Sequence, residues 1–165
     1  MAMPTMPVPA DPHRQEEYKY FDGVTRTIYV TEKEFPYPEG RLIISRTDLA
    51  GNITHANEAF VELSGWARED LIGQPHSILR HPDMPSAAFK DLWDTLKAGK
   101  KWFGYVKNLR KDGGYYWVYA TAVPNIRNGQ VVGYTSVRRE PSRKKIEEMT
   151  ALYKKMHAEE KGGQA

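Results

Sequence analysis

The side chains with the richest chemistry in this sequence are suited to holding a ligand and not to breaking bonds. Arg80, His81 and Asp83 stand in one short run, Arg-His-Pro-Asp-Met-Pro, and Asn57 and Asn108 flank that run at a distance. A guanidinium can donate paired hydrogen bonds to an anion, and an asparagine amide both donates and accepts. No nucleophile is spaced with a base, and no glycine-rich loop is placed to cradle a phosphate. The sequence therefore indicates a binding protein and not an enzyme.

Composition removes several other kinds of chemistry. The chain has no cysteine, which excludes disulfides, thiolate metal sites, iron–sulfur clusters and cysteinyl adducts. His55 and His76 have no second histidine or carboxylate at ligand spacing, so a metal is not expected and haem is a minor alternative. Lys and Arg outnumber Asp and Glu by only 24 to 21 and are dispersed, which argues against nucleic acid. The apolar runs are too short to cross a bilayer, and we expect a cytoplasmic protein.

The elements that must position these residues fall into four expected segments. Residues 1–17 contain four prolines and little that could fill a core, so we predict a disordered leader there. Aromatic and β-branched residues return in 18–40, which fits an N-terminal cap. The regular patterns lie in 41–139, the expected ligand-binding domain. Residues 140–165 place apolar side chains at helical spacing, which predicts an amphipathic helix and a tail.

Within 41–139, two groups of predicted strands enclose a group of predicted helices. Asn57 is a good N-cap for a short helix that ends at Gly65, and a longer helix begins near Ser86 and ends at Gly99. The β-prone runs are residues 42–47, 53–56, 102–111, 115–123 and 130–138, joined in part by glycine and asparagine turns. This order predicts an α+β fold with a five-stranded antiparallel sheet, helices packed on one face, and a C-terminal amphipathic helix.

Several motifs of this chain resemble the PAS domain of bacterial aerotaxis receptors. The specific ones are the run Arg80–Pro85 and the pattern Trp-x-Gly-x-Val-Lys-Asn from Trp102 to Asn108, with more general matches such as Ile53–Asn57. The resemblance implies a PAS fold over 41–139 and a flavin adenine dinucleotide (FAD) held without a covalent bond. The oxidation state of that flavin would report the redox state of the cell. FMN or an empty pocket stay open as alternatives.

The resemblance also assigns the Arg-His-Pro-Asp run to cofactor binding. It implies that Arg80 faces the pyrophosphate or ribityl part of FAD, that His81 forms a hydrogen bond nearby, and that Asp83 fixes Arg80 or a ribose hydroxyl. Spacing alone would give these residues plainer roles. By that reading Asp83 caps the following helix and His81 is a turn residue.

Two asparagines and two tryptophans complete the expected site. Asn57 and Asn108 resemble the positions that meet the flavin edge in flavin-binding PAS domains. Asn57 also fits a helix N-cap, whereas Asn108 stands in a strand interior, where asparagine is disfavoured unless its side chain has a role. Trp102 is the preferred neighbour of the flavin ring and Trp93 a second wall, although large aromatics at such positions commonly belong to a core.

The function implied is that of a PAS sensor that reports a redox, energy or oxygen-related state to a signalling output, as in aerotaxis. The alternatives are a PAS module without cofactor that mediates protein interaction or dimerisation, and a haem-binding gas sensor. Besides the flavin, the expected partner is a second protomer or a signalling domain. It would meet the sheet face or the terminal helices.

Overall fold

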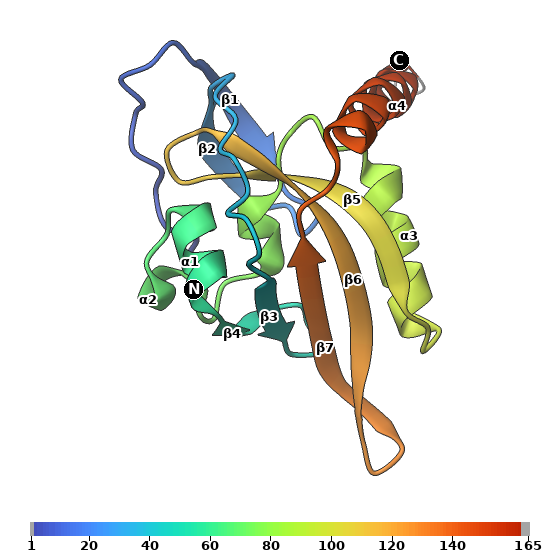
Figure 1. The fold of residues 1–165 in the computed structure, drawn as a ribbon. Coiled ribbons are helices and arrows are strands. Elements are labelled where there is room, and N and C mark those ends of the chain that lie inside the picture. Colours follow the sequence, from blue (N-terminus) through green and yellow to red (C-terminus); the bar gives the residue numbers. More distant parts are fainter. Residues whose placement is uncertain (1, 163–165) are drawn as a thin grey trace.

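A single antiparallel sheet forms the centre of the computed structural model, which describes residues 2–162 (Figure 1). Its five strands lie in the order β4-β3-β7-β6-β5, so the first hairpin meets the last three strands where β3 pairs with β7. The strands are β3 (Ile43–Thr47), β4 (Ile53–Ala56), β5 (Trp102–Leu109), β6 (Tyr115–Arg127) and β7 (Gln130–Arg139). The predicted five-stranded antiparallel sheet is confirmed.

The tight connections of the sheet explain why glycine and asparagine stand where they do. Asn128 and Gly129 have φ angles of 52° and 77°, as a two-residue hairpin between β6 and β7 requires. Gly133 lies where β7 meets β3, and a Cβ there would come within 2.3 Å of the Thr47 carbonyl oxygen. Only glycine allows the two strands to approach so closely.

Four short helical elements lie between β4 and β5 in the chain. They are α1 (Glu58–Ser64), α2 (Arg68–Leu71), the 3-10 helix η1 (His76–Leu79) and α3 (Ser86–Lys97). Figure 1 shows α1 and α2 beside β3 and β4, and α3 along β5, in agreement with the contacts between these elements. The helix predicted from Ser86 to Gly99 is confirmed, as is the short helix that Asn57 begins.

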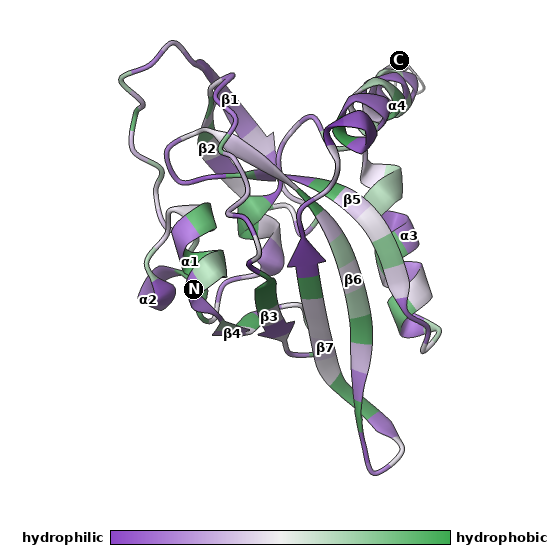
Figure 2. Ribbon diagram, viewed as in Figure 1, coloured by the Kyte–Doolittle hydropathy of each residue, from purple (hydrophilic) through white to green (hydrophobic). Residues whose placement is uncertain are grey.

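The strands turn one face of the sheet toward these helices. Residues opposite each other in the register share a face, and on this inner face they are mostly apolar and buried. The inner residues of the three long strands are Trp102, Gly104, Val106, Asn108, Tyr116, Val118, Ala120, Ala122, Tyr134, Ser136 and Arg138. Figure 2 shows green apolar bands separated by paler ones along β6. Asn108, Ser136 and Arg138 are thus polar side chains on a mainly apolar surface.

The N-terminal segment differs from the expected disordered leader. Strand β1 (Arg14–Lys19) pairs with β2 (Thr25–Val30) in a separate hairpin, and Met6 is buried in the main core with 3% of its surface exposed. The Arg26 guanidinium holds the chain down by donating to the Pro4 carbonyl at 2.9 Å. Composition cannot reveal such contacts, because they join the segment to partners distant in the sequence.

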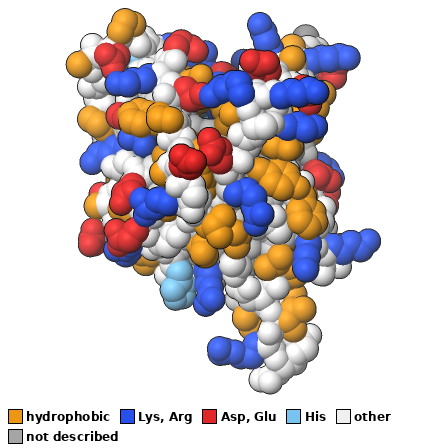
Figure 3. Space-filling model, viewed as in Figure 1, with side chains coloured by type: hydrophobic (Ala, Val, Ile, Leu, Met, Phe, Trp, Pro, Cys, Tyr) orange, Lys and Arg blue, Asp and Glu red, His pale blue; other side chains and the backbone are white. Residues whose placement is uncertain are grey.

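Helix α4 (Arg143–Gly162) confirms the predicted C-terminal amphipathic helix. Its buried residues Ile146 and Tyr153 pack with Trp117 of β6, on the face of the sheet opposite Trp102 of β5. Figure 2 shows a largely hydrophilic surface on α4, and Figure 3 shows charges of both signs interspersed across this side of the molecule. Among residues 2–162, no helix is both long enough and apolar enough to span a membrane.

Candidate functional site

The Arg80–Pro85 run lies along the free edge of β5 and meets one of the predicted asparagines. Arg80 forms an isolated antiparallel bridge with Asn108, and the Lys107 amide donates to the Met84 sulfur at 3.4 Å. A turn distant in the sequence is thereby fixed against the strand. Four of the seven predicted site residues, Arg80, His81, Asp83 and Asn108, are brought together at this place.

His81 is a buried, neutral hydrogen-bond donor. Only 1% of its surface is exposed, and burial together with the nearby Lys107 charge lowers the His81 pKa to about 3. The Asp83 amide donates to His81 Nδ1 at 3.1 Å, so the single proton of the neutral ring sits on Nε2. Within the described residues, Nε2 has no acceptor. A buried N–H without a partner points to a ligand or water acceptor at this position.

Asp83 does not cap the following helix, which excludes the plainer role that spacing alone suggested. Pro85 occupies the N-cap position of α3 and supplies no side-chain hydrogen bond. The Asp83 carboxylate instead accepts from Arg14 at 2.6 Å and pairs with Lys107 at 3.4 Å. Partial burial alone would raise the Asp83 pKa, but its positively charged neighbours hold it below the ordinary value. Asp83 thus ties the N-terminal hairpin to β5.

Arg80 lies against the beginning of α3. Its guanidinium carbon stands 4.4 Å from the centre of the Phe89 ring, and Nη2 donates to Ser86 Oγ at 3.0 Å. Tyr18 of β1 covers its other side at 5.8 Å. The Nε–H of Arg80 is buried and has no partner among residues 2–162. The buried Nε–H of Arg80 is therefore available to donate to a ligand.

Asn57 lies apart from this group, because strands β7 and β6 separate β3 from β5. Its Oδ1 accepts from the amides of Phe60 and Ile44, both at 3.1 Å, and its Nδ2 donates to the Leu42 carbonyl at 2.9 Å. The N-cap role is confirmed, and three backbone hydrogen bonds hold the amide group between α1 and β3.

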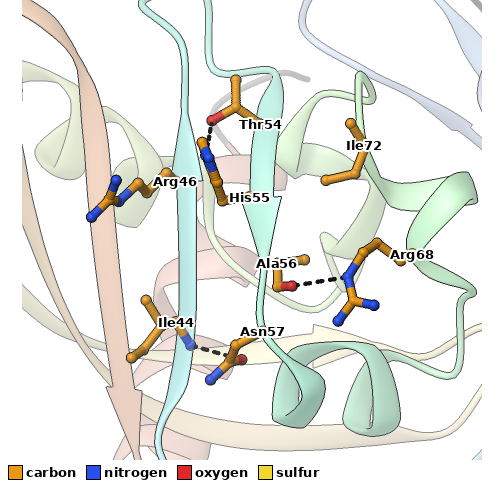
Figure 4. Close-up of a pocket in the computed structure, with 8 residues that line it drawn as sticks. All are labelled: Ile44, Arg46, Thr54, His55, Ala56, Asn57, Arg68 and Ile72. Carbon is orange, nitrogen blue, oxygen red and sulfur yellow. Dashed lines mark hydrogen bonds between the residues drawn. The ribbon is translucent and has the colours of Figure 1, made fainter.

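Asn57 also lines an open hollow of about 560 Å³ on the outer side of β3 and β4 (Figure 4). Around it stand Ile44, Arg46, Thr54, His55, Ala56, Arg68 and Ile72. The hollow shares no other residue with the predicted site. A second hollow, of about 360 Å³, lies between β5, the N-terminal hairpin and α4, and includes Asp83.

The two predicted tryptophans form one cluster on the inner face. Trp102 is 5% exposed, donates from Nε1 to Asp91 at 2.9 Å, and lies so close over Gly104 that a Cβ there would be 2.3 Å from its ring. Trp93 meets Tyr134 edge to face at 5.4 Å. Val106 packs both against this cluster and against the main core. The tryptophans thus form an aromatic wall beyond Val106, on the same face as Asn108.

Arg138, which our sequence analysis did not single out, is the most unusual residue of the inner face. It is 2% exposed, yet burial lowers its pKa only to about 10, so the guanidinium is charged at neutral pH. It donates to Ser45 Oγ at 2.6 Å and to His76 Nε2 at 3.3 Å, while its Nε–H has no partner. Within the described residues, no carboxylate pairs with it. Its guanidinium carbon stands 4.5 Å from the centre of the Phe60 ring, a contact that favours a cation but does not neutralise it. A buried cation without a counterion is costly and normally has an anionic or strongly accepting partner.

Arg138 and four other residues form what we call the inner polar cluster, which consists of Ser45, His76, Asn108, Tyr116 and Arg138. Burial and the Arg138 charge lower the His76 pKa to about 3, so its ring is neutral and can accept. Burial raises the Tyr116 pKa to about 12, while the Arg138 and Arg110 charges and the Asn108 amide act in the opposite direction. The Tyr116 hydroxyl lies near the Asn108 amide, but within the described residues no group meets it at hydrogen-bonding geometry. Asn108, 4% exposed, stands opposite Tyr116 in the register. The cluster offers one positive charge, unused donors and an amide.

A signal for Arg138 was present in the sequence. The alternation along 130–138 that predicts a strand also places Tyr134, Ser136 and Arg138 on one face. Because Tyr134 is a natural core residue, the same period predicts a buried Arg138. The unpaired hydroxyl of Tyr116 could not be predicted from the sequence, because it depends on which side chains surround that group.

Comparisons with known proteins place these features in a family context. Residues 53–138 match the family model described as PAS fold. The chain is 48% identical over 130 residues to the aerotaxis receptor of Escherichia coli, covering 79% of this chain and 26% of the receptor. It is 35% identical over 95 residues to the biofilm dispersion protein BdlA of Pseudomonas aeruginosa, covering 54% of this chain and 22% of BdlA. The chain thus spans about a quarter of the length of these relatives.

Solved structures agree on the fold. A PAS domain from Colwellia psychrerythraea is 30% identical with a TM-score of 0.56, covering 62% of this chain and 87% of that domain. The light-state LOV domain of the blue-light photoreceptor Aureochrome1 is 20% identical with a TM-score of 0.58, covering 73% of this chain and 91% of that one. At that identity the second likeness shows the fold alone.

Proposed function

Because this chain belongs to the PAS fold family, we propose that it is a sensor domain whose inner polar cluster and Arg80–Asp83 segment hold a flavin. The domain would report a redox or energy state to a signalling output, as the similarity to an aerotaxis receptor suggests. FAD is the form we propose, and the cytoplasm the compartment. The output would lie in further segments or in partner proteins, including a second copy that meets the sheet face or the terminal helices.

The observation that carries this proposal is the buried charge of Arg138, which has no counterion among residues 2–162. A flavin presents carbonyl oxygens and ring nitrogens along one edge of a large apolar ring, and reduction increases the negative charge at that edge. Such a ligand accepts hydrogen bonds from the donors that Arg138 Nε and the Tyr116 hydroxyl leave unused. The apolar inner face, with Val106 and Trp102, suits the ring.

Each remaining residue of the proposed site has a defined task. Asn108 would donate and accept at the flavin edge, and Arg80 and His81 would offer their free N–H groups to more distant polar parts of the ligand. Asp83 would act indirectly, by holding Lys107 and the N-terminal hairpin in place. We leave Asn57 out of the ligand contacts, because three backbone hydrogen bonds hold its amide and two strands separate it from the other proposed residues.

Binding measurements on variants test this assignment. FAD is titrated into the cofactor-depleted chain and into Asn108→Ala and Arg80→Ala, with Arg139→Ala as a control on the exposed side of β7. Loss of one hydrogen bond to a polar ligand group costs about 1–2 kcal/mol, so we expect the dissociation constants of the two site variants to rise roughly 5- to 30-fold. Equal affinities in all four proteins would refute the assignment.

The alternative without cofactor is favoured by one observation. Apolar side chains remain exposed on the outer surface of the domain, among them Phe103 (56% exposed), Leu42 (45%) and Ile44 (38%). Such residues can belong to a surface that meets another protein. A protein that is colourless, does not take up FAD and pairs through these side chains would support this reading.

A further inference from the structure

Helix α3 lacks a capping side chain from its own N-terminus. Its N-cap residue, Pro85, makes no side-chain hydrogen bond, although the first amides of any helix need acceptors. Both missing acceptors come from α4: Glu160 Oε2 accepts from the Ser86 amide and Oε1 from the Ala87 amide, each at 2.9 Å. A carboxylate that receives two amides at the positive end of a helix is well placed electrostatically.

The position of Glu160 is fixed by contacts earlier in α4. The Tyr153 hydroxyl donates to the Tyr105 carbonyl of β5 at 2.7 Å, and its ring stacks on Trp117 with an interplanar angle of 16°. Ile146 is buried at the beginning of the helix. Helix α4 therefore crosses β5 on one side of the sheet and reaches α3, which lies along the other side of that strand (Figure 1).

Ser86 links this contact to the proposed ligand-binding segment. Its amide donates to Glu160, while its hydroxyl oxygen accepts from Arg80 Nη2 at 3.0 Å. Arg80 also stacks on Phe89, one turn further along α3. The position of the Arg80 guanidinium thus depends on the position of the first residues of α3. Glu160 fixes those residues by accepting from the Ser86 and Ala87 amides.

We propose that Glu160 is a positioning residue for the Arg80–Pro85 segment, so that the helix following the PAS core completes the ligand site. Docking of α4 and binding of the ligand then favour each other, because a coupling free energy acts equally in both directions. The part that concerns the ligand rests on the proposed flavin function. The part that concerns residues 80–87 does not, and it can be tested without any ligand.

Backbone hydrogen exchange tests the positioning role directly in the cofactor-depleted full chain. The variants are Glu160→Ala, Glu160→Gln, which keeps an accepting oxygen, and Glu159→Ala, which alters the exposed neighbour of Glu160. Loss of a helix cap costs about 0.5–2 kcal/mol, so Glu160→Ala should speed exchange at Ser86 and Ala87 and across 80–85 roughly 3- to 30-fold. Glu160→Gln should restore part of the protection, and Glu159→Ala should change nothing there. Unchanged exchange across 80–87 in Glu160→Ala would overturn the proposal.

Binding of FAD tests the link to the ligand. Glu160→Ala should raise the dissociation constant several-fold relative to Glu159→Ala. Ser86→Ala removes the Arg80 acceptor but keeps the amide, so it should also weaken binding, and adding Glu160→Ala to it should have a smaller effect than in the wild type. Normal affinity in Glu160→Ala would contradict the coupling. If the wild-type chain takes up no flavin, the function proposed above fails, and the exchange experiment alone decides whether Glu160 positions the segment.

Discussion

Replacing Arg138 by methionine should leave the cofactor-free protein about as stable as before, or more stable, and should weaken ligand binding. Methionine fills a similar length without a charge, so a buried cation without a counterion disappears from the inner face, together with its contact to the Phe60 ring. Against this gain stand the lost hydrogen bonds to Ser45 and His76. Removing buried ionic groups in favour of apolar ones stabilises by about 1–4 kcal/mol, and each lost hydrogen bond takes back about 1 kcal/mol. Subtracting about 2 kcal/mol for the two hydrogen bonds leaves a change in stability between a loss of about 1 kcal/mol and a gain of about 2 kcal/mol.

Thermal unfolding of the apo-protein measures the first effect. For a domain of this size, such a change shifts the melting temperature by between about −4 and +8 °C. Titration with FAD measures the second: a hydrogen bond from a charged donor contributes about 1.5–3 kcal/mol, so the dissociation constant should rise roughly 10- to 100-fold. Arg139→Met, on the exposed side of the same strand, is the matched control and should change neither quantity much. A less stable apo-protein with unaltered affinity would show that Arg138 is structural and refute the reasoning.

The other predictions concern residues with purely structural or pH-dependent roles. Asn57→Ala removes three hydrogen bonds to the backbone and should lower the free energy of unfolding by about 1–3 kcal/mol while FAD affinity stays unchanged, as chemical denaturation and titration would show. Gly104→Ala places a Cβ 2.3 Å from the Trp102 ring and should destabilise by about 1–3 kcal/mol, whereas Gly99→Ala, where nothing lies within 4 Å, should cost only backbone strain. His76 and His81 have folded-state pKa values of about 3 against an ordinary 6.5, so the unfolded chain binds more protons between these values. Stability should therefore be fully present above about pH 6.5 and fall steadily as the pH drops toward 3, and a flat profile of unfolding free energy over that range would count against burial of these rings.

Local patterns were sufficient to predict most of the fold. Alternation and turn residues located the strands from Trp102 onward, and the Asn57 cap and the spacing after Ser86 located two helices. These signals work because each depends on neighbours within a few positions. That Met6 is buried in the core and that the first hairpin is folded could not be predicted in this way. Both features depend on contacts with Arg26 and with core residues far along the chain.

The candidate site was only partly predictable for the same reason. The run from Arg80 to Asp83 and Asn108 could be named from their resemblance to a known motif, and the structure brings them together at the β5 edge. Asp83 pairs with Arg14, and Glu160 caps α3, across long distances in the sequence. Local residue spacing cannot predict such contacts. The alternation along β7 was sufficient to predict that Arg138 is buried. The absence of a counterion could not be predicted, because it depends on which residues surround Arg138 in the fold.

The visible absorption spectrum of the purified chain, with the bound molecule released by heat and identified, tests the central claim most directly. The account predicts a yellow protein that absorbs in the blue, loses that absorption on chemical reduction, regains it in air, and releases FAD on denaturation. A protein that is purified colourless, and that stays colourless after incubation with excess FAD, would contradict the claim that the inner polar cluster holds a flavin.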